Sequence, residues 1–289
     1  MGSMRDIKRR KSSIQSTQQI TKAMKLTATV KLQRAKLRAE QAQPYFDAMY
    51  ATVTSMLAKT ENIDHPYLKS GGTGKKAVIV ITGNRGLAGG YNSNIIKMVK
   101  ALEFPKEDIV LYTIGSKGRD ALAAKGYTIA HDYSEIVEDP MYSDAMVIGK
   151  RLLDAFAAGE ISEIYLAYTF FKNTVSHDPR IIKLLPVEIN PEETEASDVV
   201  PGSSAPMNYE PEEEEALGLI IPKYITSLLY GALVQSVASE NGARMQAMDS
   251  ATSNADAMID ELSLLYNRAR QGSITQELTE IIAGANAIS

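Results

Sequence analysis

The residues of this chain best suited to hold a ligand form a glycine-rich turn behind an apolar run. The turn reads G-N-R-G-L-A-G-G-Y-N, from Gly83 to Asn92, and a strand, a glycine turn and a helix together can cradle a phosphate group. Its glycines fit neither a P-loop, whose lysine and hydroxyl are missing, nor the G-x-G-x-x-G spacing. The pattern favours a tight, closely packed turn, and nucleotide binding at residues 83–92 stays an alternative.

Other residue combinations that could carry chemistry are missing from the sequence. There is no cysteine, and the histidines, His65, His131 and His177, are far apart in the chain. No serine stands in a nucleophile elbow, and the acidic run Glu212 to Glu215 is too regular and solvated for acid–base work. We expect no catalytic residue, no metal site and no cofactor.

The charge of the chain is unevenly distributed. Residues 1–40 hold eleven basic residues against two acidic ones, whereas residues 184–222 hold no basic residue at all. A basic arm is typical of a chain that meets nucleic acid, a membrane surface or an acidic protein, although it can also be a solvated helix face.

The last residues form an uncharged end. From Ile281 to Ser289 no residue carries a charge, and Ile281, Ile282 and Ile288 are strongly apolar. This end either folds back onto its own domain or enters a socket made by another protein. Because apolar contact has no preferred direction, a socket could hold the end and still let it turn.

Two long helices are expected at the ends of the chain. Residues 223–289 contain no proline, and residues 1–43 contain only Gly2 as a helix breaker. A helix of roughly 50 residues is about 75 Å long, longer than the domain that the middle of the chain can form. Such helices need partners.

Each long helix has a stripe of small and apolar residues at three- and four-residue spacing, the pattern of a coiled coil. The first stripe skips Arg10 and gains one residue after Ala28, like a stutter. Small residues bury little apolar surface, so the pair is expected to be only modestly stable by itself. The stripes comprise Ile7, Ile14, Thr17, Thr21, Met24, Ala28, Leu32, Ala35, Ala39 and Ala42, and Met248, Thr252, Ala255, Ile259, Leu262, Tyr266 and Ala269.

The middle of the chain alternates between apolar runs and helical patterns. Such alternation predicts a parallel, Rossmann-like sheet with right-handed crossovers. The fold class is therefore α/β, with the four segments 1–60 (long helix), 76–190 (α/β domain), 191–222 (acidic, proline-containing linker) and 223–289 (long helix). Strands are expected at 77–82, 109–114, 163–171 and 180–187, and helices at 92–102, 117–125 and 145–158.

The C-terminal residues carry a resemblance to a known family. The string I-T-Q-E-L-T-E-I-I-A-G-A-N-A, from Ile274 to Ala287, resembles the C-terminal signature of the gamma subunit of F-type ATP synthases, of the bacterial type. Residues 243–248 (A-R-M-Q-A-M), residues 266–271 (Y-N-R-A-R-Q) and the N-terminal stretch 6–35 are similar to that family as well. The turn at 85–92 also resembles the family, with Asn84 where aspartate is usual.

The resemblance implies the central rotor shaft of the F1 sector. The two long helices would form an antiparallel, left-handed coiled coil inside a ring of three alpha and three beta subunits. The α/β domain would lie near the epsilon subunit and the c-ring. Rotation would couple transmembrane proton flow to ATP synthesis or hydrolysis in the ring, and the chain itself would not be an enzyme. It would be a peripheral protein on the cytoplasmic side of a bacterial cell membrane, without bilayer insertion or nucleic acid.

The resemblance also assigns contact residues. Met24 and Lys25 match the segment that faces the acidic loop of a beta subunit, and Arg244, Gln276 and Thr279 match positions that bind the beta subunit's catch. Tyr209 and Glu210 match the foot, near epsilon and the c-ring. Ile281, Ile282 and Ile288 would form the tip in its bearing.

A nucleic-acid-binding coiled-coil protein is the alternative function, since the basic N-terminal helix could lie against phosphates. The lack of interleaved aromatic residues and the sequence pI of about 5.6 oppose it.

Overall fold

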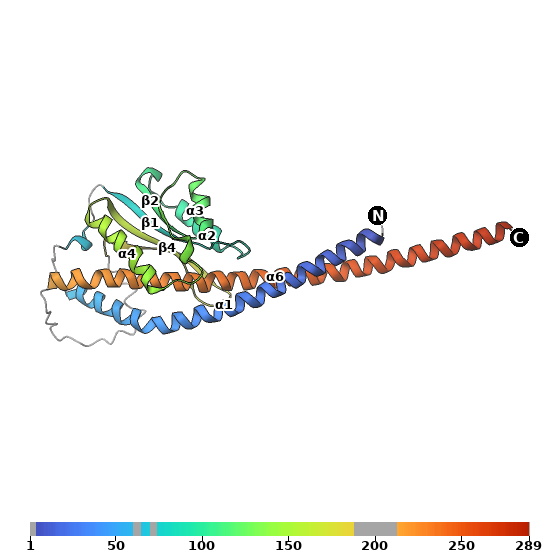
Figure 1. Cartoon of the computed structure of the whole chain (residues 1–289), viewed down its shortest axis with the longest axis horizontal. Helices are drawn as coiled ribbons and strands as arrows, with labels where there is room; N and C mark the ends of the chain where they lie inside the picture. The colour runs from blue at the N-terminus through green and yellow to red at the C-terminus, as the bar shows by residue number, and fades with distance from the viewer. Residues whose placement is uncertain (1–3, 60–64, 70–73, 188–212, 289) are drawn as a thin grey trace. The chain divides into compact units, whose positions relative to one another are not determined.

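The structure is a computed structural model of the chain, and it describes residues 4–59, 65–69, 74–187 and 213–288. The chain divides into two compact units, which are described separately. Unit 1 comprises residues 1–29 and 244–289, and unit 2 comprises residues 30–243. Two helices, α1 (Met4–Lys59) and α6 (Glu213–Ile288), contribute residues to both units (Figure 1).

Both long helices contain a proline, Pro44 in α1 and Pro222 in α6. The sequence places a linker up to residue 222, because proline usually ends a helix, but α6 begins ten residues earlier at Glu213. Burial explains the difference. Leu217 and Ile221, which precede the proline, are fully buried together with Ile225 and Leu229, so one apolar face runs through the proline and outweighs its missing hydrogen bond. The segment boundaries 1–60, 76–190, 191–222 and 223–289 otherwise stay predictions, and residues 191–212 of the linker lie outside the described residues.

Unit 2 contains a five-stranded sheet of order β3-β2-β1-β4-β5. Strands β1 (Lys75–Ile81), β2 (Ile109–Ile114), β3 (Thr128–Asp132) and β4 (Ile161–Phe171) pair in parallel, and β5 (His177–Leu185) is antiparallel to β4. In the central pair Ile79 lies opposite Tyr112. The connecting helices are α2 (Tyr91–Lys100), α3 (Ser116–Ala123) and α4 (Tyr142–Ala157), with three short 3-10 helices at Pro66–Leu68, Lys106–Asp108 and Ser134–Ile136.

Successive residues of the strands contribute alternately to two separate hydrophobic cores. Val78 and Val80 of β1 pack with α2 and α3, whereas Ile79 and Ile81 of the same strand pack with α4 and α6. Successive side chains of a strand point to opposite faces of the sheet, so a run that is apolar throughout needs a helical layer on both sides. The domain therefore has three layers, and α6 supplies part of one of them.

Two features of the sheet differ from the sequence prediction. The prediction of an all-parallel sheet is wrong for β5: only residues 172–176 separate it from β4, and a parallel crossover needs a dozen residues or more. Asn173 closes this short turn by accepting hydrogen bonds from the backbone N–H groups of Val175 and Ser176. The sequence also missed β3, an edge strand that is mostly exposed and so has no apolar run.

One described helix, α6, has the length and composition that could cross a membrane. Within residues 215–286 an 18-residue window reaches a mean hydropathy of 1.6, and 56% of that window is buried inside the protein. The core contacts of α6 in unit 2 account for this apolar character.

Gly115, at the start of α3, is the position where a side chain is least tolerated. Its φ is 110°, and an added Cβ would lie 2.0 Å from the carbonyl oxygen of Thr82, at the end of β1. We predict that Gly115→Ala lowers the free energy of unfolding by about 3 kcal/mol or more, because backbone strain and a clash with fixed backbone add up.

The matched control is Gly126→Ala, with φ 85° and no atom within 4 Å of the added Cβ; only strain remains there, about 1 kcal/mol. Urea unfolding of the full chain, followed by the near-ultraviolet circular dichroism of its tyrosines, measures both. Equal losses in the two variants would contradict this account of Gly115.

Candidate functional site

The two helices of unit 1 pair through polar contacts around a narrow seam (Figure 1). The hydroxyls of Thr21 on α1 and Thr252 on α6 lie 2.8 Å apart, the Lys25 ammonium bonds to Asp249 at 2.6 Å, and Gln18 bonds to Asp256. Residue numbers rise on one helix as they fall on the other, so the pair is antiparallel. Of the predicted seam residues in this unit only Thr17 is fully exposed, and Gln18 makes the contact next to it.

Met24, Lys25 and Arg244 lie in one stretch of this pair. All three are half-buried, and Lys25 stands opposite Asp249, about a turn and a half along α6 from Arg244. The Lys25–Asp249 pair is partly exposed on both sides, 39% for the lysine and 58% for the aspartate. An exposed pair of this kind contributes little to stability, about 0–1 kcal/mol, so Lys25 can exchange its partner at low cost.

Gln276 and Thr279 lie far from that stretch. About 27 residues of helix separate Gln276 from Asp249, which corresponds to about 40 Å. Gln276 donates to Glu280 at 2.9 Å, and Thr279 donates to the carbonyl of Thr275 at 2.8 Å. Both residues are exposed, and their hydrogen bonds to described residues lie within their own helix. The structure thus divides the five predicted contact residues between two separate places along the helices of unit 1.

The end of α6 extends beyond its partner helix. The pairing register places Met4, the first described residue of α1, level with roughly residue 270 of α6. From Gln271 to Asn286 every residue except Ser273 is exposed. This segment, which we call the overhang, extends beyond the first described residue of α1 as a continuation of α6 (Figure 1).

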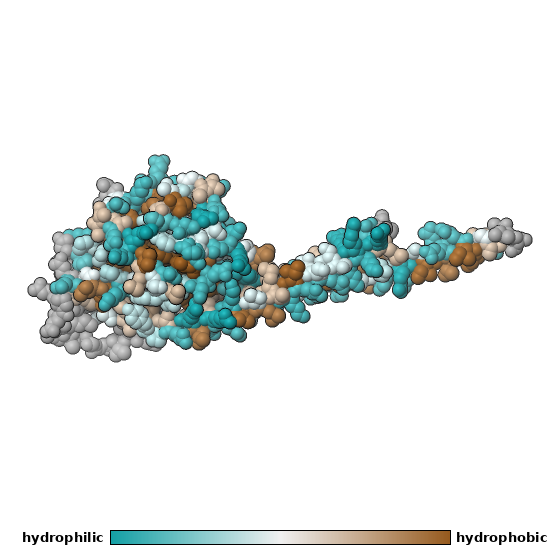
Figure 2. All heavy atoms as spheres, in the orientation of Figure 1, coloured by the Kyte–Doolittle hydropathy of each residue, from teal (hydrophilic) through white to brown (hydrophobic). Residues whose placement is uncertain are grey.

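The overhang carries an apolar stripe. Its members recur at the i, i+4, i+7, i+8 spacing of one helix face, and Figure 2 shows hydrophobic residues gathered along one side of the last turns. The stripe consists of Ile274 (48% exposed), Leu278 (55%), Ile281 (67%) and Ile282 (59%). Of the predicted tip residues, the side chain of Ile288 lies outside the described part of the chain, as do Tyr209 and Glu210 of the predicted foot.

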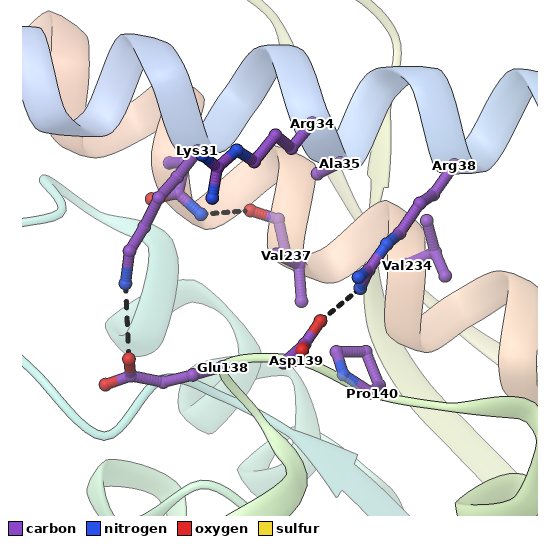
Figure 3. Close-up of a pocket in the computed structure, with 10 residues that line it drawn as sticks. Lys31, Arg34, Ala35, Arg38, Glu138, Asp139, Pro140, Val234 and Val237 are labelled. Carbon is purple, nitrogen blue, oxygen red and sulfur yellow. Dashed lines mark hydrogen bonds and ion pairs between the residues drawn. The ribbon is translucent and has the colours of Figure 1, made fainter.

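Unit 2 contains a cavity of about 280 Å³ between α1, α6 and the loop before α4 (Figure 3). Lys31 bonds to Glu138 at 3.2 Å on one side, and Arg38 bonds to Asp139 on the other. Glu138 also bonds to Arg85 at 3.1 Å. This role of the two acidic residues could not be predicted, because nothing in the sequence indicates that the loop faces α1. They neutralise part of the basic face that the sequence assigns to a partner.

The cavity has a mixed lining. Ala35, Val234 and Val237 form an apolar wall, and Pro140 lies opposite, while the charged groups stand at its rim (Figure 3). Two of its three basic residues already hold carboxylates. The arrangement ties a loop of the α/β domain to α1 and provides no group poised for chemistry.

The glycine-rich turn is closed by its own side chains. Asn92 accepts a hydrogen bond from the N–H of Gly83 at 2.8 Å and donates to the carbonyl of Arg85 at 3.1 Å. Asn84 accepts from the N–H of Ser116 and donates to the carbonyl of Ser134 at 2.7 Å. A carboxylate has no hydrogen to donate to that carbonyl, so the contact with Ser134 gives a physical reason for an asparagine at residue 84.

The polar cluster beyond β2 is likewise satisfied. Burial opposes the ionisation of Asp132, but hydrogen bonds from Ser134, Thr113 and Arg119 outweigh it and lower the pKa of this carboxyl group. The three bonds are 2.7, 2.9 and 2.8 Å long. Such a carboxylate is held as an anion and does not act as a proton donor at neutral pH. Within the described ranges no group of three or more histidine, aspartate or glutamate residues could hold a metal ion.

The chain is similar to known proteins along almost its whole length. A family model described as "ATP synthase" matches residues 3–288. The gamma chain of the ATP synthase of Lachnoclostridium phytofermentans is 67% identical over 291 residues and covers 100% of both chains. The sodium-ion-specific gamma chain of Acetobacterium woodii is 42% identical over 298 residues, with 99% of each chain covered.

Solved structures with a similar fold come from mitochondrial ATP synthases. One is a chain of the central stalk and c-ring structure of Tetrahymena thermophila, with 25% identity, a TM-score of 0.58, and coverage of 80% of this chain and 99% of that one. Another belongs to the rotor of Euglena gracilis, with 19% identity, a TM-score of 0.65, and coverage of 94% and 98%. With a matching family model and full-length relatives, the chain belongs to the family of ATP synthase gamma chains.

Proposed function

We propose that this chain, as the rotor shaft of an ATP synthase, works by contact alone and has no catalytic site of its own. The enzyme is a hetero-oligomeric, membrane-associated complex. In the proposal the paired helices of unit 1 stand inside a ring of three alpha and three beta subunits and turn as protons cross the membrane. An asymmetric shaft makes different contacts with each beta subunit and so shifts each one toward a different conformation.

The observation that carries the proposal is the overhang of α6. An apolar stripe that stays exposed in the described part of its own unit is a candidate binding surface, and each of its side chains gains roughly 1.5–3 kcal/mol when fully buried. In the proposal the stripe enters an apolar sleeve formed by the ring. Gln276 and Thr279 stand at the same level, where they bind the beta subunit's catch. The sleeve needs no charge complementarity, so it places no electrical barrier on rotation.

The basic face of α1 supports the second contact. In unit 1, Lys8, Arg10 and Lys22 are exposed, and no acidic group among the described residues pairs with them. Their charge attracts the acidic loop of a beta subunit over roughly one Debye length, about 8–10 Å. Met24, Lys25 and Arg244 then form the close contact with that loop.

The foot of the rotor is proposed from the resemblance alone. Tyr209 and Glu210 would stand near the epsilon subunit and the c-ring, and both residues lie outside the described part of the chain. The proposal places the protein on the cytoplasmic side of the cell membrane as a peripheral subunit that does not enter the bilayer.

Lys25 can pair with Asp249 of α6 and, in the proposal, contacts the acidic loop of the beta subunit. A charge swap distinguishes these two roles. We predict that Lys25→Asp combined with Asp249→Lys restores the pairing of α1 with α6, because the ion pair is rebuilt in the opposite direction. The acidic loop of the beta subunit then meets an aspartate, so the ratio of protons pumped to ATP hydrolysed falls in reconstituted vesicles, while recovery of the complex stays normal.

The control is the same swap in the exposed pair of Lys36 and Glu40, 3.7 Å apart on α1. It should leave the ratio within about twofold of the native value, since an exposed pair contributes at most about 1 kcal/mol. Native coupling in the Lys25 swap would show that Lys25 serves helix pairing alone.

A second prediction concerns the apolar stripe. Ile281→Asp should weaken the hold of the ring on the shaft by about tenfold or more, because a charge replaces a buried methyl surface. Thermal inactivation of the assembled alpha–beta–gamma complex measures this hold, and ATP hydrolysis at low temperature should persist, since the stripe carries no chemistry.

Ala283→Asp places the same charge on the opposite side of the overhang and should leave the inactivation temperature almost unchanged. A complex that tolerates aspartate at both positions would argue against an apolar sleeve around this end.

A further inference from the structure

The place where doubly wound α/β domains bind ligands can be located in this sheet. Ligands enter the crevice outside the carboxyl ends of two neighbouring strands at the point where the strand order reverses. Here β1 continues through α2 to β2 on one side of it, whereas β4, its neighbour on the other side, continues away from it to β5. The crevice therefore lies between the ends of β1 and β4, beside Gly83.

Helix α6 occupies this crevice at β4. The hydroxyl oxygen of Ser236 accepts a hydrogen bond from the N–H of Thr169 at 3.4 Å, and the hydroxyl of Ser239 donates to the carbonyl of the same residue at 3.2 Å. Both serines are at most 1% exposed. Two side chains of α6 thus clasp one residue of β4, two positions before the strand ends.

At β1 the same stretch of α6 presents a carboxylate. The Glu240 side chain is packed so closely on Gly83 that a Cβ added there would lie 2.6 Å from its Oε1 and 2.8 Å from its Cδ. Glu240 is 8% exposed. A buried carboxyl group stands directly after β1, where other doubly wound domains hold the phosphate of a ligand.

A third close approach follows two residues later in α6. A Cβ on Gly242 would lie 2.6 Å from Cε1 of His177, the first residue of β5. The side chain of His177 is itself packed against Phe171 at the end of β4. Residues 236–242 therefore touch the ends of three neighbouring strands, and we call Ser236, Ser239, Glu240 and Gly242 the crevice key.

The key differs in kind from the rest of the α6 contact. Between Leu217 and Leu233 the helix meets the sheet through buried aliphatic side chains, and such contact is non-directional, so it resists separation better than it resists turning. Hydrogen bonds and a close glycine–carboxylate fit have fixed geometry. These contacts therefore fix the rotation of α6 about its own axis relative to the α/β domain.

We propose that the crevice key locks α6 to the α/β domain against rotation, so that torque reaching the domain passes into the shaft, with Glu240 as the central positioning residue. The proposal rests on the rotor function stated above. It assigns the crevice to the chain's own helix in place of a nucleotide ligand. Nucleotide binding at residues 83–92, which the sequence left as an alternative, is therefore not expected.

The test uses the complete ATP synthase reconstituted in vesicles, with ATP hydrolysis and ATP-driven proton pumping measured on the same preparation. Glu240→Ala removes the centre of the key, and the ratio of pumping to hydrolysis should fall by roughly threefold or more, because the domain slips on a helix that still turns in the ring. Glu240→Gln keeps the shape and should keep the ratio within about twofold. Native coupling in the alanine variant would overturn the proposal.

A second pair of variants tests the contact even where Glu240→Ala assembles poorly. Gly83→Ala drives a methyl group into the carboxylate and should lower the ratio, whereas Gly86→Ala in the same turn, with open space around its Cβ, should not. In the double variant Gly83→Ala with Glu240→Ala, the ratio of pumping to hydrolysis should be no lower than in Glu240→Ala alone, because the carboxyl group that the new methyl group would strike has been removed. Strictly additive defects, or equal effects of the two glycine variants, would overturn the key.

The rotor function and the key can fail separately. If the native chain neither joins the alpha–beta ring nor supports coupled pumping, the proposed function is wrong. If the native complex pumps normally and both the Glu240→Ala and Gly83→Ala complexes pump equally well, only the crevice key is wrong.

Discussion

The burial of one face of α6 against the sheet is the interaction on which the rest of the molecule depends. Leu217, Ile221, Ile225 and Leu229 are fully buried there, and at about 25 cal/mol per Å² this apolar surface is the principal source of stability between the helix and the α/β domain. The face is strong enough to carry the helix through Pro222. Residues of α6 that belong to unit 1 are not packed on the sheet, so their stability has to come from contacts that bury less apolar surface.

The helix pair of unit 1 shows what those contacts are. Its seam consists largely of alanine, threonine and methionine, with Ala28, Met248 and Ala255 buried, and a threonine hydroxyl pair stands where a coiled coil usually has two aliphatic residues. A seam of this kind permits close approach and buries little surface. The seam and the exposed stripe of the overhang form the part of the chain that, in the proposal, other subunits cover.

Electrostatics divides the basic helix α1 into two parts. In unit 2, Lys31 and Arg38 are held by Glu138 and Asp139 of the chain's own domain. In unit 1, several basic side chains have no acidic neighbour in the described part, and the proposed partner supplies that charge. The same residue type thus serves attachment in one unit and, in the proposal, recognition of a partner in the other, and the position of an acidic loop decides which.

The sequence by itself determined the elements with strong periodicity. The apolar runs around Val78 and Leu111 became central strands, and the seams of the two long helices were placed correctly except at Thr17, which is exposed. The C-terminal signature gave the family. Each of these signals is local, because side-chain period and residue type report directly on which face of an element is buried.

Tertiary structure alone decided the rest. The edge strand β3 forms because β2 offers it a partner, β5 turns antiparallel because its loop is short, and residues 213–222 are helical because the sheet buries Leu217 and Ile221. Nothing in the sequence indicates that Glu240 meets Gly83 or that Glu138 meets Lys31. These contacts join residues more than a hundred positions apart, and such pairs are set by the packing of whole elements, on which local residue patterns carry no information.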